Sequence, residues 1–95
     1  KDNIDFKKKI SEGAIVIDVR TPEEYSRGHI ENSVNIPLDK FEQSLDLLND
    51  KEKTIITCCA SGMRSEKAKK ILKKLEYSQV YNGGGWSSLN KKINK

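Results

Sequence analysis

Two short runs of apolar, mostly β-branched residues constrain the fold of this chain more than any other feature. They span residues 14–19 (AIVIDV) and 54–57 (TIIT). A continuous run of this kind is typical of a strand that is buried on both faces of a sheet. A helical pattern follows each run after a short connection, which leaves room only for crossover packing. We therefore predict an α/β fold with a mainly parallel sheet and helices on both faces.

The other elements follow from periodicity and from turn residues. A capping box of Thr21 and Glu24 predicts a short helix that stops at Gly28. Further helices are predicted near residues 3–12, with Gly13 as a cap, and over residues 38–49, 64–76 and 86–94. Further strands are predicted at residues 34–36, 53–58 and 79–82. The glycines at 83–85 predict a turn whose backbone comes close to another segment.

Two of these helices have their apolar residues on one face, which we expect to be buried. The spacing i, i+3, i+4, i+7 defines this face in the 64–76 helix. Its members are Ala68, Ile71, Leu72 and Leu75. The corresponding residues of the 38–49 helix are Phe41, Leu45 and Leu48.

The charge and length of the chain limit its partners. The chain has 95 residues and a formal net charge of +4, with an excess of lysine. Much of this lysine lies on the outer face of the 64–76 helix and at the C-terminus. We expect a solvated surface there, because a nucleic-acid site more often gathers arginines and aromatic residues on one face, and no run is long and apolar enough to cross a membrane. We expect one domain over residues 1–95, a monomer, and a cytoplasmic location, or an exported one if a signal was removed before Lys1.

Cys59 lies where a predicted strand ends and a predicted helix begins. The first turn of a helix offers unpaired backbone N–H groups and partial positive charge, and both favour a thiolate. Ala60, Ser61 and Gly62 are small enough for the backbone to curl around the sulfur. Arg64 adds a cation with a fork of donors. The loop is therefore predicted to hold a reactive sulfur or an oxyanion.

Polar features follow three of the predicted strands: Asp18, the Cys59 loop and the glycines at 83–85. Because the carboxyl ends of parallel strands meet at one rim of the sheet, these features should converge there. The adjacent Cys58 and Cys59 lack the spacing of a disulfide framework or a zinc site, and the single His29 does not complete one. We therefore expect no metal and no cofactor.

The order of these motifs resembles the rhodanese family over residues 14–90. The resemblance is carried by five segments, at 16–25 (VIDVRTPEEY), 28–30 (GHI), 35–37 (NIP), 59–65 (CASGMRS) and 80–85 (VYNGGG). The short length is similar to that of small single-domain rhodaneses of the phage-shock-protein-E kind.

This resemblance implies a thiosulfate sulfurtransferase. In that family the loop cysteine attacks the outer sulfur of a donor, keeps it as a persulfide and passes it to a thiophilic acceptor. Cys59 matches the nucleophile by position, and Arg64 matches the donor-binding cation. The implied acceptors are a thiol or cyanide, and a thioredoxin-like protein is a candidate partner. The residues whose backbone N–H groups are expected to hold the persulfide are Ala60, Ser61, Gly62, Met63 and Ser65.

The resemblance also implies supporting roles. Asp18 and Arg20 match the family's DVR element, and we expect Asp18 to brace the loop and Arg20 to pair with Glu24. His29 matches the family's GHI element. A hydrogen-bonded histidine that fixes a turn is favoured there over a general base.

Two alternative functions stay open. One is a phosphatase or arsenate reductase on the same fold. The active-site loops of those enzymes resemble Cys-x5-Arg, whereas the loop here is Cys-x4-Arg. The shorter loop forms a smaller cradle, which favours a sulfane sulfur over phosphate or arsenate. The other is a non-enzymatic rhodanese-like binding module, which is expected to lack the cysteine.

Cys58 stands where rhodaneses usually carry an apolar or aromatic residue, and alternation along the strand predicts that its sulfur points away from Cys59. We favour a Cys58 thiol that only packs in the core over a resolving thiol, which would attack the Cys59 persulfide or sulfenate and release the extra sulfur.

Overall fold

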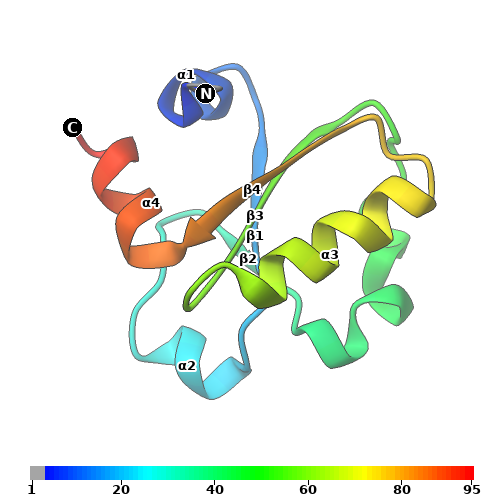
Figure 1. The fold of residues 1–95 in the computed structure, drawn as a ribbon, viewed down its shortest axis with the longest axis horizontal. Helices are drawn as coiled ribbons and strands as arrows, with labels where there is room; N and C mark the ends of the chain where they lie inside the picture. The colour runs from blue at the N-terminus through cyan, green and yellow to red at the C-terminus, as the bar shows by residue number, and fades with distance from the viewer. Residues whose placement is uncertain (1–3) are drawn as a thin grey trace.

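A parallel sheet forms the centre of the structure, a computed structural model that describes residues 4–95 (Figure 1). Its strands are β1 (Ile15–Asp18), β2 (Val34–Asn35), β3 (Thr54–Cys59) and β4 (Gln79–Gly85). They lie in the order β2-β1-β3-β4, and every neighbouring pair is parallel. The predicted α/β fold with a parallel sheet is therefore confirmed.

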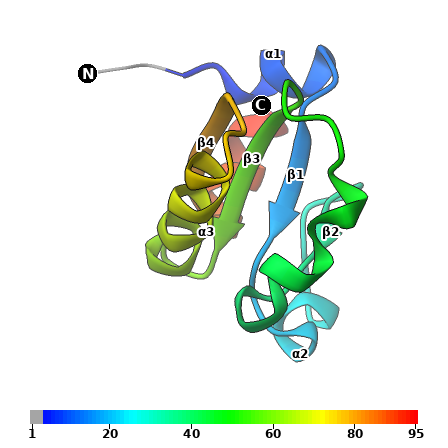
Figure 2. The ribbon, with the colours of Figure 1, turned by 90° about the vertical axis from the view of Figure 1, so that its right-hand side faces the viewer.

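Helices cover both faces of this sheet, as predicted. They are α1 (Phe6–Ser11), α2 (Pro22–Ser26), α3 (Met63–Lys74) and α4 (Trp86–Ile93). Figure 1 shows α1 and α4 on one side of the sheet and α3 on the other. Figure 2 shows α2 below the carboxyl ends of the strands. Each face has its own apolar core: Ile17, Ile55 and Leu72 lie in one, and Phe6, Ile56 and Leu89 in the other.

Local sequence signals explain where the first two helices begin and end. The Asp5 side chain accepts a hydrogen bond from the Lys8 backbone N–H, and Gly13 follows the helix with φ +106°, as expected of a cap. Asn3, the first residue of the predicted 3–12 helix, lies outside the described residues. The predicted capping box of Thr21 and Glu24 is present at the start of α2.

The predicted 38–49 helix is wrong in type. The segment forms two 3₁₀ helices, η1 (Leu38–Lys40) and η2 (Glu42–Leu47). It must run from the carboxyl end of β2 back to the start of β3, and the 3₁₀ rise of about 2.0 Å per residue spans more distance than the α-helical 1.5 Å. Phe41, Leu45 and Leu48 are nevertheless buried, as predicted.

The predicted turn at glycines 83–85 is also wrong, because β4 continues through Gly85. The pairing with β3 shifts there by one residue, from Thr57 opposite Asn82 to Cys59 opposite Gly85. The predicted close approach is confirmed. A Cβ on Gly85 would lie 2.9 Å from the carbonyl oxygen of Ala60. Only glycine lets β4 come this near the Cys59 loop.

The buried face of α3 differs from the prediction at its end. Ala68 and Leu72 are buried and Ile71 is half-buried, but Leu75 is 37% exposed because the helix ends at Lys74. Ser65 is buried on the same face. None of the helices in residues 4–95 is long and apolar enough to span a membrane.

Candidate active site

The Cys59 loop connects β3 to α3 at the carboxyl rim of the sheet. Cys59 is the last residue of β3, and Gly62 takes φ +104° immediately before α3. Cys58 pairs with Asp18 on β1, and Cys59 pairs with Gly85 on β4. The predicted convergence of Asp18, the loop and the glycines at one rim is therefore confirmed.

The Cys59 sulfur accepts hydrogen bonds from two backbone N–H groups and contacts the Ser65 hydroxyl. The backbone N–H groups of Gly62 and Ser65 lie 3.0 and 3.3 Å from Sγ, and the Ser65 hydroxyl oxygen lies 3.4 Å away. Burial acts to raise the pKa of Cys59. Hydrogen bonds from the side chain and backbone of Ser65, and from the backbone of Gly62 and Ser61, outweigh it and hold the pKa below its ordinary value. The site thus favours a thiolate.

The remaining residues of the predicted cradle are exposed to solvent. Ala60 and Ser61 are exposed, and Met63, the first residue of α3, is 74% exposed. The Cys59 side chain itself is 1% exposed. That these backbone groups hold a persulfide stays a prediction.

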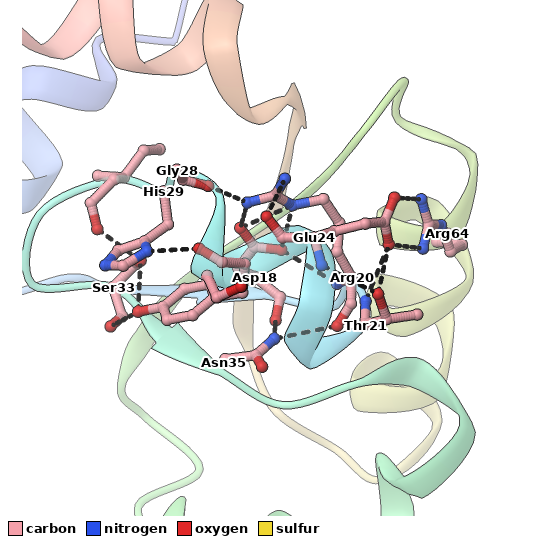
Figure 3. Close-up of polar contacts among 12 residues, drawn as sticks. Asp18, Arg20, Thr21, Glu24, Gly28, His29, Ser33, Asn35 and Arg64 are labelled. Carbon is pink, nitrogen blue, oxygen red and sulfur yellow. Dashed lines mark hydrogen bonds and ion pairs between the residues drawn. The ribbon is translucent and has the colours of Figure 1, made fainter.

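Arg64 forms an ion pair with Glu24 of α2. Its Nη1 and Nη2 atoms donate to the two carboxylate oxygens of Glu24 at 2.8 and 3.0 Å (Figure 3). These bonds, together with the backbone N–H of Thr21, lower the pKa of Glu24 to about 2. The expectation that Arg20 pairs with the Glu24 carboxylate is therefore wrong. Arg20 reaches only the backbone carbonyl of Glu24, at 3.3 Å.

Arg20 instead pairs with Asp18 inside the protein. Its Nε and Nη2 atoms donate to the Asp18 carboxylate at 2.9 and 2.8 Å, and Nη2 also donates to the Gly28 carbonyl at 2.7 Å (Figure 3). The guanidinium lies 4.8 Å from the centre of the Trp86 ring. Within residues 4–95, the hydrogen bonds of the Asp18 carboxylate all come from Arg20, so the expectation that Asp18 braces the Cys59 loop is wrong. The pair joins β1, the end of α2 and α4.

His29 fixes a turn, as predicted. Its Nδ1 atom lies 2.7 Å from the Tyr25 carbonyl oxygen, which requires the proton on Nδ1, and its ring stacks on the Tyr25 ring at 3.8 Å. The Tyr25 hydroxyl in turn donates to the Ser33 carbonyl at 2.7 Å.

Asn82 is the site residue whose role the sequence did not reveal. It lies on β4 and accepts a hydrogen bond from the Ser65 hydroxyl at 2.7 Å. Its Nδ2 atom donates to the Gly62 carbonyl at 3.2 Å, so it holds both ends of the loop turn. The available signal was a polar residue near the carboxyl end of a strand at the functional rim.

Cys58 lies on the opposite face of the sheet from Cys59. It packs in the core with Ile56 and Leu89, whereas Cys59 packs with Ala68 and Leu72. The predicted opposite orientation of the two sulfurs is confirmed. Within the described chain, no three histidine, cysteine, aspartate or glutamate side chains are grouped to hold a metal ion.

The chain belongs to the rhodanese-like domain family, which matches residues 2–92. It is 39% identical over 70 residues to the thiosulfate sulfurtransferase PspE of Escherichia coli K12, which covers 73% of this chain and 67% of that protein. It is 35% identical over 92 residues to a putative mitochondrial thiosulfate sulfurtransferase of Schizosaccharomyces pombe, covering 83% of this chain and 65% of that protein. The chain thus spans about two thirds of the length of these relatives.

The fold comparison agrees with the sequence. A solved structure described as a rhodanese with anions from E. coli superposes with a TM-score of 0.73 at 37% identity. The alignment covers 79% of this chain and 89% of that one. The predicted resemblance to the rhodanese family is confirmed.

Proposed function

We propose that this protein is a thiosulfate sulfurtransferase that carries a sulfane sulfur on Cys59. The observation that carries the proposal is the pair of backbone N–H groups, those of Gly62 and Ser65, that donate to the Cys59 sulfur. A cysteine ionised by such donors attacks a sulfur without a separate general base. The names of two similar proteins, both thiosulfate sulfurtransferases or putative ones, support the same activity.

The proposed reaction has two displacements at sulfur. The Cys59 thiolate attacks the outer sulfur of thiosulfate, the S–S bond of the donor breaks, and sulfite leaves with the electron pair. The outer sulfur of the resulting persulfide is then attacked by cyanide or a thiolate. Its bond to Cys59 breaks, and the thiolate is restored. Backbone N–H groups of residues 60–65 stabilise the negative charge, which lies on the Cys59 sulfur in the thiolate and on the outer sulfur in the persulfide.

Arg64 is the proposed cation for an anionic donor. It lines a hollow of about 360 Å³ with Val19, Leu38 and Asp39, and we place the donor there rather than in a larger hollow next to α1 that includes Phe6 and Lys92. Because Arg64 is paired with Glu24, the donor must share or displace that carboxylate. Because Cys59 is buried, the exposed loop must also open slightly for sulfur to enter.

Mass spectrometry of the intact protein tests the function. Incubation with thiosulfate should add one sulfur atom, cyanide should remove it as thiocyanate, and Cys59→Ser should take up none. Failure of the wild-type protein to gain sulfur would overturn the proposal. Hydrolysis of p-nitrophenyl phosphate at a rate above that of sulfur transfer would favour the phosphatase alternative instead, which the four-residue spacing from Cys59 to Arg64 disfavours.

Two substitutions test the role of Arg64. Arg64→Ala should raise the KM for thiosulfate, since a charge-assisted contact of about 1.5–3 kcal/mol is lost. Glu24→Gln keeps a side chain that completes the capping box but frees Arg64, so it should lower that KM. Glu23→Gln, an exposed neighbour on α2, is the matched control and should change nothing.

The proposal extends to the organisation of the protein. We propose that residues 1–95 form one rhodanese domain that acts as a monomer, since both cores are built within this chain. Size-exclusion chromatography with light scattering checks the oligomeric state, and a mass above that of one chain would contradict it.

A further inference from the structure

The amide of Asn82 has only one orientation that satisfies its neighbours. Its Oδ1 atom accepts from the Ser65 hydroxyl at 2.7 Å and from the Gly84 backbone N–H at 2.8 Å. Its Nδ2 atom donates to the Gly62 carbonyl at 3.2 Å and to Glu66 Oε1 at 3.0 Å. A flipped amide would set its oxygen against two acceptors and its NH₂ group against an N–H donor. Oδ1 therefore faces Ser65.

This orientation decides where the proton of the Ser65 hydroxyl lies. A serine hydroxyl has one proton, and here two groups compete for it: Asn82 Oδ1 at 2.7 Å and Cys59 Sγ at 3.4 Å. While Cys59 is a thiol, its S–H donates to the hydroxyl oxygen and the hydroxyl donates to Asn82. When Cys59 ionises, the hydroxyl must either leave Asn82 or turn a lone pair toward the thiolate.

We propose that Asn82 is a positioning residue that competes with the Cys59 sulfur for the Ser65 hydroxyl proton and so restrains ionisation of the thiol. Asn82 acts against the backbone N–H groups of Gly62 and Ser65, which favour the thiolate. The consequence for turnover rests on the proposed function. A thiolate becomes a weaker nucleophile as its pKa falls, and the best attacking thiol titrates near the ambient pH.

Charged groups surround the site on every side, and the test must separate them from Asn82. Arg64 and its partner Glu24 lie on the α2 side, and Glu66 contacts Asn82 from α3. On the sheet side, Cys58 is the neighbour of Cys59, and the Asp18–Arg20 pair lies on β1. All of them except Cys58 remain in the variants below, and Cys58 is replaced in every variant alike.

A double-mutant cycle on the pH midpoint of Cys59 alkylation tests the proposal without any sulfur transfer. Iodoacetamide rates are measured from pH 5 to 10 in a Cys58→Ala background, so that the signal belongs to Cys59. With Ser65 present, Asn82→Ala should lower the midpoint by roughly half a unit to one unit, because the hydroxyl proton is free to reach the thiolate. In a Ser65→Ala background, the same change should shift the midpoint by less than about 0.2 units.

Further variants separate this role from simple bracing of the loop. Asn82→Asp keeps the acceptor and adds a negative charge, so it should raise the midpoint while Asn82→Ala lowers it. Asn94→Ala, an exposed position at the end of α4, is the control and should leave the midpoint unchanged. An equal shift on Asn82→Ala in both Ser65 backgrounds, or a rise in both Asn82 variants, would overturn the proposal. Circular dichroism checks that each variant is folded. If Asn82→Ala unfolds, the rise of the alkylation midpoint expected of Asn82→Asp remains to be measured.

Discussion

Cys58 and Cys59 are neighbours in the chain and equally buried, yet their environments are opposite. Their side chains are 0% and 1% exposed. Burial, with a contribution from Asp18, raises the pKa of Cys58 from 9.0 to about 12. Cys59 is held below its ordinary pKa because hydrogen bonds from Ser65, Gly62 and Ser61 outweigh its burial.

The comparison shows that burial alone does not set the reactivity of a thiol. Cys58 faces the α1 and α4 side of the sheet, where its neighbours are apolar side chains and the Asp18–Arg20 pair. Cys59 faces α3, where the preceding loop turns its backbone N–H groups toward the sulfur. Because side chains alternate along a strand, one residue step separates a packing thiol from a reactive one.

The strongest test of this contrast is alkylation of the folded protein at pH 7. With a pKa of about 12, only about one Cys58 in 10⁵ is ionised at pH 7, so iodoacetamide should label Cys59 alone. Cys59→Ser should abolish labelling, and Cys58→Ala should leave it at the wild-type rate. Peptide mass spectrometry locates the label. Label on Cys58 at a rate comparable to that of Cys59 would break the comparison.

The two thiols should also affect stability at alkaline pH in opposite directions. The raised pKa of Cys58 stabilises the folded thiol fully below about pH 9, and this contribution is lost as the pH rises toward about 12. The loss is on the order of 4 kcal/mol, so Cys58→Ala should flatten the alkaline decline of the free energy of unfolding. The lowered pKa of Cys59 adds stability as the pH rises to about 9, and Cys59→Ser should remove that gain.

Urea unfolding of both variants between pH 7 and 11 checks this prediction. Alkaline slopes that match wild type in Cys58→Ala would show that the Cys58 thiol is not desolvated in solution.

A substitution at Gly62 should affect Cys59 and not Cys58. Gly62→Ala places a side chain at φ +104°, which costs about 1–2 kcal/mol and disturbs the N–H that donates to Sγ. We expect a raised pKa for Cys59 and slower alkylation at pH 7. Gly13→Ala is a matched control with φ +106°, remote from the loop. It should cost similar stability and leave the alkylation rate unchanged. Equal alkylation rates in the two variants would contradict the role of the Gly62 N–H.

The smallest expected effect is that of Cys58 on resistance to peroxide. Because its sulfur lies on the other face of the sheet, Cys58→Ala should lose some stability and keep the wild-type rate of inactivation. Inactivation assays with and without reductant measure this. Much faster loss in the variant, with reductant reviving only the wild type, would show that Cys58 resolves oxidised Cys59.

Much of the fold was predictable because its signals are local. Thr21 and Glu24 start α2 through a capping box, and the apolar runs before Asp18 and Cys59 form the central strands. The 38–49 segment was predicted wrongly because the i, i+4, i+7 spacing of Phe41, Leu45 and Leu48 is that of an α-helix, whereas the segment forms two 3₁₀ helices on its way from β2 to β3. The glycines at 83–85 were misassigned because the residues that they approach most closely on β3 and its loop, Ile56 and Ala60, are distant in sequence.

The sequence by itself determined that Cys59 ends a buried strand, that a helix follows it, and that Cys58 points the other way, since each depends on periodicity and small residues near the cysteine. Only the tertiary structure decided that Arg64 pairs with Glu24, Arg20 with Asp18, and Ser65 with Asn82. Charged and amide side chains have several eligible partners in the chain. Which of them meet depends on how the carboxyl ends of β1, β3 and β4 are brought together, and no local pattern records that arrangement.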